Sequence, residues 1–309
     1  MLQKLGLKAN RFDLHCHTPF SDGTKEVIDL LIDAQKAGLE VISFTDHDTL
    51  RVYDYLSDIN PKNWYSGKII NGVEITVDVD GERLEVLAYN FDLEKLKKYK
   101  YFQRAYDQKV VNKQIKKLAK KAKKMGFVCE PVIKNTGRPS IWRPIYDGIM
   151  ANEKQNAELI KKYGITDPKH FSRVLFSTKG QPFYMKASYA PSIKKIYKVV
   201  HKCGGLCIFA HPYNYGKKDI DYLLDKFRTE KVIDGIECGH SSHSNREIEH
   251  LVRYCDEYGL LKTAGSDFHG GERYYENGFI NFAFGYLGAK GEPRPITAKM
   301  LGYKFENTK

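Results

Sequence analysis

The sequence Phe-Asp-Leu-His-Cys-His at residues 12–17 decides how the rest of the chain is interpreted. Its apolar residues predict a buried strand, and the side chains of a strand alternate between its two faces. His15 and His17 therefore lie on one face, where two imidazoles can bind one metal ion. A single His-x-His pair often has only a structural role, so this interpretation depends on whether similar residues follow other strands.

Short apolar runs typical of strands alternate with segments of helical periodicity along much of the chain. The strands predicted after residue 17 span residues 41–45, 68–77, 83–89, 206–210, 232–238 and 260–265. Helices are predicted from Thr24 to Gly38, from Pro191 to Gly204, and around residues 220–227 and 248–259. This alternation indicates an α/β fold built around a largely parallel sheet or a barrel.

Residues 91–190 interrupt the alternation, and we interpret them as an inserted, mostly helical lobe within a domain made of residues 1–90 and 191–309. Residues 91–130 contain 12 Lys and 1 Arg against 4 acidic residues, a net charge of +9. Apolar residues recur there at helical spacing from Val111 to Met125, which predicts a helix with one apolar face. The basic remainder of that helix is either a solvated surface or a surface that steers an anionic substrate.

Composition limits the class of protein. At 309 residues, with 42% hydrophobic and 13% aromatic residues, the chain can bury a large core and is expected to be globular. No stretch is long and apolar enough for a signal peptide or a membrane span, so we expect a cytoplasmic protein. The six cysteines lack the spacing of a zinc ribbon and are expected to be buried free thiols. The net charge of +12 indicates an anionic partner, such as a nucleotide, a nucleic acid or an acidic protein.

Potential metal ligands recur where predicted strands end. The residues that directly follow these strands are Asp46, His47, His211, Asp267 and His269. In a barrel of strands and helices the carboxyl ends of the strands meet at one rim, so residues distant in sequence gather there. Asp46 and Asp48, on either side of His47, either orient such ligands or are exposed loop carboxylates.

Two glutamates belong to a predicted hairpin. Asp80-Gly81 is a strong signal for a two-residue turn, which sets Val79 opposite Glu82 and puts Glu74 and Glu85 on the same face. As diagonal neighbours, their side chains would be roughly 7 Å apart, close enough to hold one ion. Glu85 is therefore either a metal ligand or a polar residue on a solvated strand face.

Taken together, these motifs resemble the PHP (polymerase and histidinol phosphatase) superfamily over about residues 12–271. The similar segments are Asp13-Leu-His-Cys-His-Thr-Pro-Phe-Ser-Asp-Gly23, Thr45-Asp-His-Asp-Thr49, Gly72-Val-Glu-Ile75, Ala210-His-Pro212 and Gly265-Ser-Asp-Phe-His-Gly270. Further segments resemble its stand-alone phosphoesterase branch: Gly137-Arg-Pro139, Gly180-Gln-Pro-Phe-Tyr184 and Ser241-Ser-His-Ser244. That branch includes nucleotide phosphatases and 5′→3′ exonucleases.

The resemblance implies a distorted (β/α)7 barrel with three divalent metal ions. The implied ligands of the first ion are His15, His17, Glu74 and Asp267. The second would be bound by Glu74, Glu85 and His211, and the third by Asp22, His47 and His269. Glu74, Asp267 and His269 are expected to be central to catalysis. Manganese, iron and zinc are the expected ions, and magnesium would also suit the carboxylates.

The chain departs from the family pattern at two positions. Glu85 stands where relatives commonly have His, and a carboxylate favours manganese, magnesium or iron over zinc. Residues 213–215, Tyr-Asn-Tyr, replace a segment that often contains a basic residue. We therefore expect substrate phosphate to contact Arg138, Arg143 or His243, because a planar guanidinium suits phosphate oxygens.

The activity implied is hydrolysis of phosphate esters of nucleotides or of nucleic-acid ends, with a metal-activated hydroxide as the nucleophile. Hydrolysis of histidinol phosphate is an alternative from the same superfamily. A different alternative is a nucleic-acid-binding or regulatory module that has lost turnover, which the change at Glu85 suggests. The expected partner is a phosphorylated substrate, and the sequence indicates no protein partner.

Overall fold

The computed structural model describes residues 1, 4, 6, 8–104, 108–132, 140–185, 190–215, 219–270, 284–287 and 294–302. The chain forms two compact units. The first comprises residues 1–76, 85–97 and 193–309, and the second comprises residues 77–84 and 98–192. The metal ligands suggested by the sequence all belong to the first unit.

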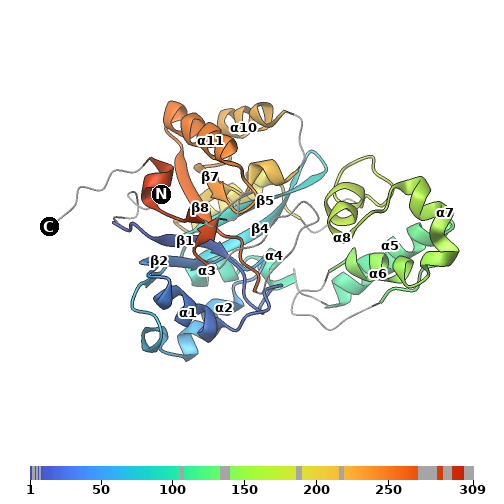
Figure 1. Ribbon diagram of the computed structural model, residues 1–309, viewed down its shortest axis with the longest axis horizontal. Coiled ribbons are helices and arrows are strands. Elements are labelled where there is room, and N and C mark those ends of the chain that lie inside the picture. The colour runs from blue at the N-terminus through green and yellow to red at the C-terminus, as the bar shows by residue number, and fades with distance from the viewer. Residues whose placement is uncertain are drawn as a thin grey trace. The chain divides into compact units, whose positions relative to one another are not determined.

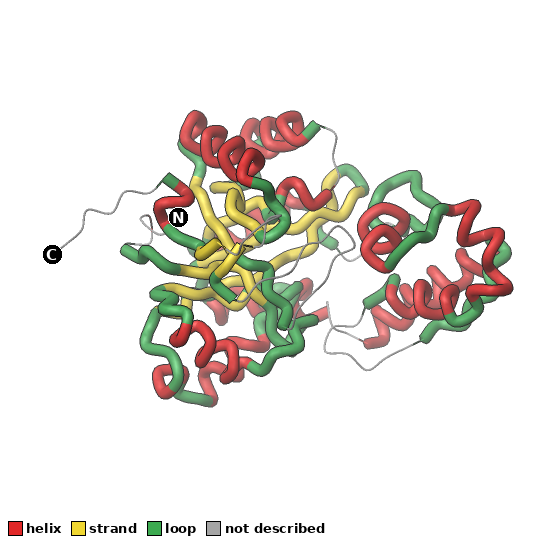
Figure 2. The backbone as a smooth tube through the Cα atoms, viewed as in Figure 1, coloured by secondary structure: helices red, strands yellow, loops and turns green. Residues whose placement is uncertain are grey.

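The strands of the first unit belong to two main sheets (Figures 1 and 2). One is parallel and has the order β1 (Phe12–Cys16), β2 (Val41–Phe44), β3 (Lys68–Ile69). The other has the order β4 (Gly72–Val79), β5 (Glu82–Tyr89), β6 (Leu206–Phe209), β7 (Gly235–His240), β8 (Leu261–Gly265). Strand β6 is antiparallel to β5 and parallel to β7, and β7 is parallel to β8. A short pair, β9 (Tyr286–Leu287) and β10 (Arg294–Pro295), forms a third sheet.

Isolated bridges just beyond the strand ends connect the two main sheets. Cys16 pairs with Phe268, which links β1 to the chain that leaves β8. His47 pairs with Glu74, which links the chain that leaves β2 to β4. The fold is thus mixed α/β, and the strand pairing of the described residues includes no closed barrel. The carboxyl ends of strands from both sheets nevertheless lie next to one another.

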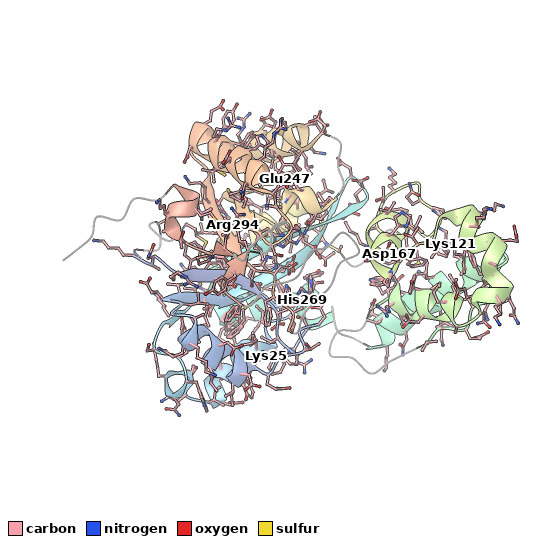
Figure 3. The ribbon with its side chains drawn as sticks, viewed as in Figure 1. Lys25, Lys121, Asp167, Glu247, His269 and Arg294 are labelled. Atoms are coloured by element: carbon pink, nitrogen blue, oxygen red, sulfur yellow. The ribbon has the colours of Figure 1, made fainter. Side chains whose placement is uncertain are left out.

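Helices cover the strands of the first unit on two sides. Figure 1 shows α1 (Val27–Lys36) and α2 (Arg51–Asp58) on one side of the strands, and α10 (Ile220–Thr229) and α11 (Asn245–Tyr258) on the other. The unit also contains α3 (Leu93–Lys97) and α9 (Ile193–Lys202). Helix α11 begins with a capping box, in which Ser244 and Glu247 (Figure 3) satisfy each other's backbone amides. It ends at Gly259 in the left-handed conformation that favours glycine.

The predicted hairpin is formed by β4 and β5. Asp80 and Gly81 have φ of 54° and 91°, as a type I′ turn requires. The single strand predicted over residues 68–77 is wrong, because it is divided into β3 and β4. Lys68 and Ile69 pair with β2, whereas β4 pairs with β5, so the chain changes sheets between them.

The second unit is mostly helical. Its helices are α4 (Lys100–Arg104), α5 (Gln108–Lys124), α6 (Arg143–Met150), α7 (Glu153–Tyr163), α8 (Pro168–His170) and a π-helical segment at Phe171–Phe176. Their apolar faces enclose a core of their own, in which Phe127, Phe171 and Phe183 lie in ring contact. Among the helices of the described residues, none has the length and apolar character needed to cross a membrane. All six cysteines are buried free thiols, as predicted.

Candidate metal centre

Strand β1 supplies the first two potential ligands. His15 and His17 are both buried, and their Nε2 atoms lie 3.2 Å apart. The strand is held between its neighbours by hydrogen bonds from Thr45 N–H to the Cys16 carbonyl and from His17 N–H to the Phe268 carbonyl. Alternation along the strand therefore turns both imidazoles toward the ends of β4 and β8.

A first group of ligand atoms lies around these imidazoles. Atoms of His15, His17, Glu74 and Asp267 are all within 4.8 Å of one another. The Asp267 Oδ1 atom lies 3.4 Å from His15 Nε2 and 3.1 Å from His17 Nε2. Glu74 Oε2 lies 3.3 Å from the same two nitrogens. These four residues are the set implied for the first ion.

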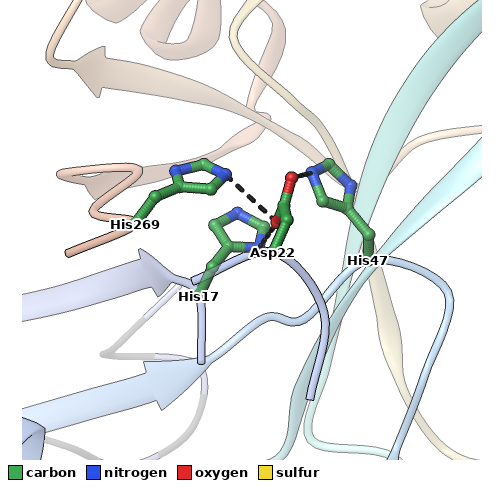
Figure 4. Close-up of side chains that lie close together, drawn as sticks. All are labelled: His17, Asp22, His47 and His269. Atoms are coloured by element: carbon green, nitrogen blue, oxygen red, sulfur yellow. Dashed lines mark ion pairs between the residues drawn. The ribbon is translucent and has the colours of Figure 1, made fainter. Parts of the chain in front are cut away.

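A second group shares His17 with the first. Ligand atoms of His17, Asp22, His47 and His269 lie within 4.8 Å of one another (Figure 4). Asp22 lies between the imidazoles: its carboxylate oxygens are 3.3 Å from His269 Nε2 and 3.8 Å from His47 Nε2. The His269 Nδ1 atom is 2.7 Å from the Asp267 carbonyl and can donate to it, which leaves Nε2 free to face Asp22. The structure thus brings together the three ligands implied for the third ion, and His17 lies next to them.

A third group gathers around Glu85. Ligand atoms of His47, Glu74 and Glu85 lie within 4.8 Å of one another, as the hairpin register predicts. His211 Nε2 lies 2.8 Å from Glu74 Oε1 and 3.6 Å from Glu85 Oε2. The Glu85 side chain is 24% exposed, so it lies at the edge of the cluster and not on a distant solvated face. The set implied for the second ion is also brought together.

Glu237 and His240, both on β7, join the cluster although the sequence analysis did not single them out. Glu237 Oε1 accepts a hydrogen bond from His15 Nδ1 at 2.8 Å, and its other oxygen accepts from the His211 backbone N–H. His240 Nε2 lies 3.3 Å from Asp267 Oδ2. The sequence did contain one signal for His240, because it lies two residues beyond the strand predicted over residues 232–238, as His47 lies two residues beyond the strand predicted over 41–45.

The aspartates beside His47 are buried and bonded to the backbone, so they are not exposed loop carboxylates. Asp46 accepts hydrogen bonds from the Thr18 N–H and hydroxyl and from the Ser21 hydroxyl. Asp48 accepts hydrogen bonds from the N–H and hydroxyl of Thr76. Asp46 thus fixes the loop that leads to Asp22, and Asp48 fixes the start of the His47 loop against β4.

The backbone is strained at three of these residues. Asp48 and Asp267 have φ of 54°, and His211 has φ of 26°. Positive φ is unfavourable for residues with a side chain and tends to persist where the surrounding structure enforces it, often at functional sites. Here it accompanies sharp turns just after strands, which direct Asp267 and His211 back into the cluster.

The buried carboxylates of the cluster require positive charge nearby. Burial disfavours ionisation of Glu74, but His47 and His15 more than offset it and keep the Glu74 pKa well below its ordinary value. Burial likewise opposes charge on Asp267, whose pKa is lowered by His269 and His15. Burial would lower the pKa of His17, yet the carboxylates of Asp267 and Glu74 raise it to about 10. The buried carboxylates are therefore ionised and need cationic partners.

The donor set fits divalent metal ions. The Glu74 Oε2 atom is buried and makes no hydrogen bond within the described part of the chain. Three imidazole nitrogens nevertheless surround it: those of His15 and His17 at 3.3 Å and that of His47 at 3.0 Å. Glu74 Oε1 is bonded to His211 Nε2, so it is Oε2, facing three imidazole nitrogens without a hydrogen bond, that is suited to a cation placed among them.

The residues expected to contact substrate phosphate differ in their placement. Arg138 lies outside the described residues. Arg143 begins α6 in the second unit, where its Nε donates to Asp147 at 2.8 Å. His243 is fully buried next to His240, its Nδ1 bonds the Cys238 carbonyl, and burial lowers its pKa to about 3. Contact of Arg143 or His243 with a phosphate remains a prediction.

Comparisons with known proteins agree with this geometry. Residues 13–238 match the family model described as PHP domain. The chain is 28% identical to a 5′-3′ exoribonuclease of Haemophilus influenzae, over 84% of this chain and 90% of the relative. It is 23% identical to the 5′-3′ exoribonuclease Rnm of Escherichia coli, over 84% and 85%.

A solved structure resembles the fold as well. It is of a protein from Bifidobacterium adolescentis described as a metal-dependent phosphoesterase. The TM-score is 0.60 at 23% identity, and the match covers 85% of this chain and 89% of that one. Because the family model matches well over half of the residues, including those that form the cluster from His15 to Glu237, the chain belongs to the PHP domain family.

Proposed function

We propose that this protein is a metal-dependent phosphoesterase that hydrolyses phosphate esters of nucleotides or of nucleic-acid ends. The observation that supports this most is the overlap of four potential metal-binding groups: the three described above and His15, Glu237 and His240. They share His15, His17, His47 and Glu74. Closely spaced divalent ions suit phosphate-ester hydrolysis, because they can stabilise the attacking and the leaving oxygen together. The names of the relatives, which include two 5′-3′ exoribonucleases, support the same reaction class.

We infer three ion sites from the ligand groups. The first would be formed by His15, His17, Glu74 and Asp267, the second by Glu74, Glu85 and His211, and the third by Asp22, His47 and His269. Glu85 adds a carboxylate to the second site, so manganese, iron or magnesium is expected there in preference to zinc. When bound, such ions lower the pKa of a water molecule and neutralise charge on phosphoryl oxygens.

The protein's own contribution is to fix the ligands and their protons. Because Glu237 accepts a hydrogen bond from His15 Nδ1, the lone pair of the imidazole is at Nε2, which faces Glu74 and Asp267. The Asp267 carbonyl fixes His269 in the same way. These hydrogen bonds hold the imidazoles in one tautomer and orientation before substrate arrives, so little reorganisation remains for the reaction.

We also propose the distorted (β/α)7 barrel of the family as the fold of the first unit, with residues 91–190 as an insertion between 1–90 and 191–309. The bridges that join β1 to the end of β8, and the end of β2 to β4, support this arrangement. A barrel would place all nine implied ligands at one rim.

A substrate panel tests the proposed function. Purified protein with manganese is offered an aryl phosphate, histidinol phosphate and 5′-phosphorylated oligonucleotides, and products are measured over time. Release of mononucleotides from oligonucleotides would identify an exonuclease, and release of inorganic phosphate alone a phosphatase. Turnover of histidinol phosphate alone would favour that alternative. Tight oligonucleotide binding without any product would contradict the proposed function and favour a binding module.

A further inference from the structure

Helix α5 (Gln108–Lys124) concentrates positive charge in the second unit. Its 17 residues contain no acidic side chain and eight lysines, Lys109, Lys113, Lys116, Lys117, Lys120, Lys121, Lys123 and Lys124. The neighbouring helix α7 mixes both signs, with Glu153 and Glu158 beside Lys154, Lys161 and Lys162. A helix face in this unit can thus be solvated by side chains of both signs, so solvation alone does not explain why α5 carries only positive charge.

The packing of α5 fixes the direction of its lysines. Val111, Ile115, Leu118 and Ala122 are buried in the core of the unit, so the opposite face must point to solvent. Seven of the lysines are exposed, namely Lys109, Lys113, Lys116, Lys117, Lys120, Lys123 and Lys124. They recur at intervals of three and four residues, with Lys116–Lys117 and Lys123–Lys124 as adjacent pairs, and form one continuous band on this face, which we call the α5 lysine stripe.

Of the eight lysines of α5, only Lys121 lies outside the stripe. It lies off the line of the stripe and is half-buried, and its Nζ donates to the Tyr184 carbonyl at 2.7 Å (Figure 3). Lys123 pairs with Glu130 at the margin. Within the described ranges, Lys113, Lys116 and Lys120 form no ion pair.

The end of the stripe borders a depression of about 520 Å³. It is lined by Lys116, Ala119, Lys120, Lys123, Lys124, Glu130 and Pro131. Glu130 pairs with Lys123 there, which leaves Lys116, Lys120 and Lys124, and these like charges four residues apart on the helix repel one another. An anion bound in the hollow would relieve this repulsion, so the hollow favours an anionic ligand.

We propose that the α5 lysine stripe binds the sugar–phosphate backbone of a single-stranded nucleic acid. From Lys109 to Lys124 the helix rises about 22 Å, which is long enough to contact several consecutive phosphates and far longer than one mononucleotide needs. Lysine is a compact charge without directional base recognition, so the binding is independent of sequence. The lysines all lie on one face of a single helix, so their charge forms one band, which matches one strand. This inference deepens the proposed function by selecting polynucleotides as substrates.

The test compares two variants that each lose four positive charges. The stripe variant is Lys113→Gln/Lys116→Gln/Lys120→Gln/Lys124→Gln. The matched control carries Lys→Gln at four exposed lysines of α9 in the first unit, Lys194, Lys195, Lys198 and Lys202. Both are made in the Asp267→Ala background to prevent cleavage, and thermal unfolding verifies that each is folded.

Binding of a fluorescent single strand of about 16 nucleotides, the upper range of common site sizes, is measured between about 50 and 200 mM salt. The stripe variant should bind at least about tenfold more weakly than the control, and its slope of log K against log salt should be shallower by about 3. A second variant with Lys→Arg at the same four positions should restore both values, because it restores the charge.

Equal binding by the stripe variant and the control would overturn the proposal. So would tighter binding of a duplex of equal length, or displacement of the strand by polyglutamate at equal charge concentration, which would indicate an acidic protein partner. Hydrolysis of an aryl phosphate by the unmodified chain reports separately on the proposed function. If the unmodified chain cleaves the aryl phosphate but the stripe variant binds the single strand as tightly as the control does, the proposed function stands. Only the role of the α5 lysine stripe in binding is then excluded.

Discussion

At the scale of single residues, Glu85 is one of the two positions where the sequence analysis found a departure from the family's usual pattern. Its carboxylate lies 3.6 Å from both His47 Nδ1 and His211 Nε2, so it is placed to act as a ligand. Replacing it by His would supply the borderline-soft nitrogen donor that zinc accepts readily. The identity of this residue should therefore determine which metal supports activity.

We predict that Glu85→His raises the ratio of zinc-supported to manganese-supported hydrolysis by about tenfold or more. The ratio is measured with one substrate after loading metal-free protein with each ion. Glu82→His, on the same strand but outside the cluster, serves as the control and should leave the ratio unchanged. An unchanged ratio in Glu85→His would show that Glu85 binds no metal.

Glu237 acts through His15 and the His211 backbone and is a positioning residue. We predict that Glu237→Gln weakens manganese activation by about 10- to 100-fold, because the amide no longer stabilises the required imidazole tautomer. The measurement is the manganese concentration that gives half-maximal hydrolysis. Glu247→Gln, in the capping box of α11, should lower the unfolding temperature without altering that concentration. Normal manganese activation of Glu237→Gln would contradict the role.

The ligands taken from the family motifs were predictable because each follows a strand or has a fixed spacing within a motif. Glu237 and His240 were missed for a structural reason. The strand was expected to end at Cys238, and simple alternation would place residues 237 and 240 on opposite faces. The register of β7 against β8 shifts between Glu237 and Gly239, and this bulge allows both side chains to reach the cluster. Such a bulge leaves no clear signal in one sequence.

At the scale of elements, the close approach of β1 and β8 sets the geometry of the cluster. A Cβ atom at Gly265, the last residue of β8, would lie 2.1 Å from His15 Cβ and 2.5 Å from His15 N. Glycine is therefore required here by contact with the neighbouring strand and not by an unusual φ. The carboxyl end of β8 carries Asp267 to the same place.

We predict that Gly265→Ala separates β1 from β8, lowers the free energy of unfolding by about 1–3 kcal/mol and strongly reduces manganese-dependent hydrolysis. Gly38→Ala is the matched control, because Gly38 has φ of 64° but nothing within 4 Å of its Cβ position. It should cost about 1–2 kcal/mol without changing activity per folded molecule. Full activity of Gly265→Ala would show that the strand approach does not position the ligands.

Most elements were predictable from periodicity, since amphipathic helices such as α1 and α11 and buried strands such as β6 have clear patterns. The division of residues 68–77 into β3 and β4 was missed because the segment is rich in apolar and β-branched residues, although it contains Asn71-Gly72, a dipeptide typical of turns. That dipeptide marks the division but does not indicate which strand each part pairs with. Pairing between distant strands depends on the assembled fold and not on local sequence.

At the scale of the whole molecule, the chain combines a unit that carries the candidate metal centre with a helical unit that has its own core. The sequence predicted an insertion from its loss of alternation. It could not predict that the hairpin tip at residues 77–84 belongs to the second unit, because those residues continue strands of the first. Family membership supports the fold, while the closure of the barrel remains a prediction.

The most direct test of the account compares hydrolysis of an aryl phosphate by the manganese-loaded protein and by Asp267→Ala/His269→Ala. The control is Asp221→Ala/His201→Ala, which removes the same two residue types from the helices α10 and α9. We predict that the double variant stays folded but loses about three orders of magnitude in kcat/KM, the equivalent of several kcal/mol, whereas the control keeps its activity. Undiminished hydrolysis by Asp267→Ala/His269→Ala would contradict the assignment of this cluster as the catalytic metal centre.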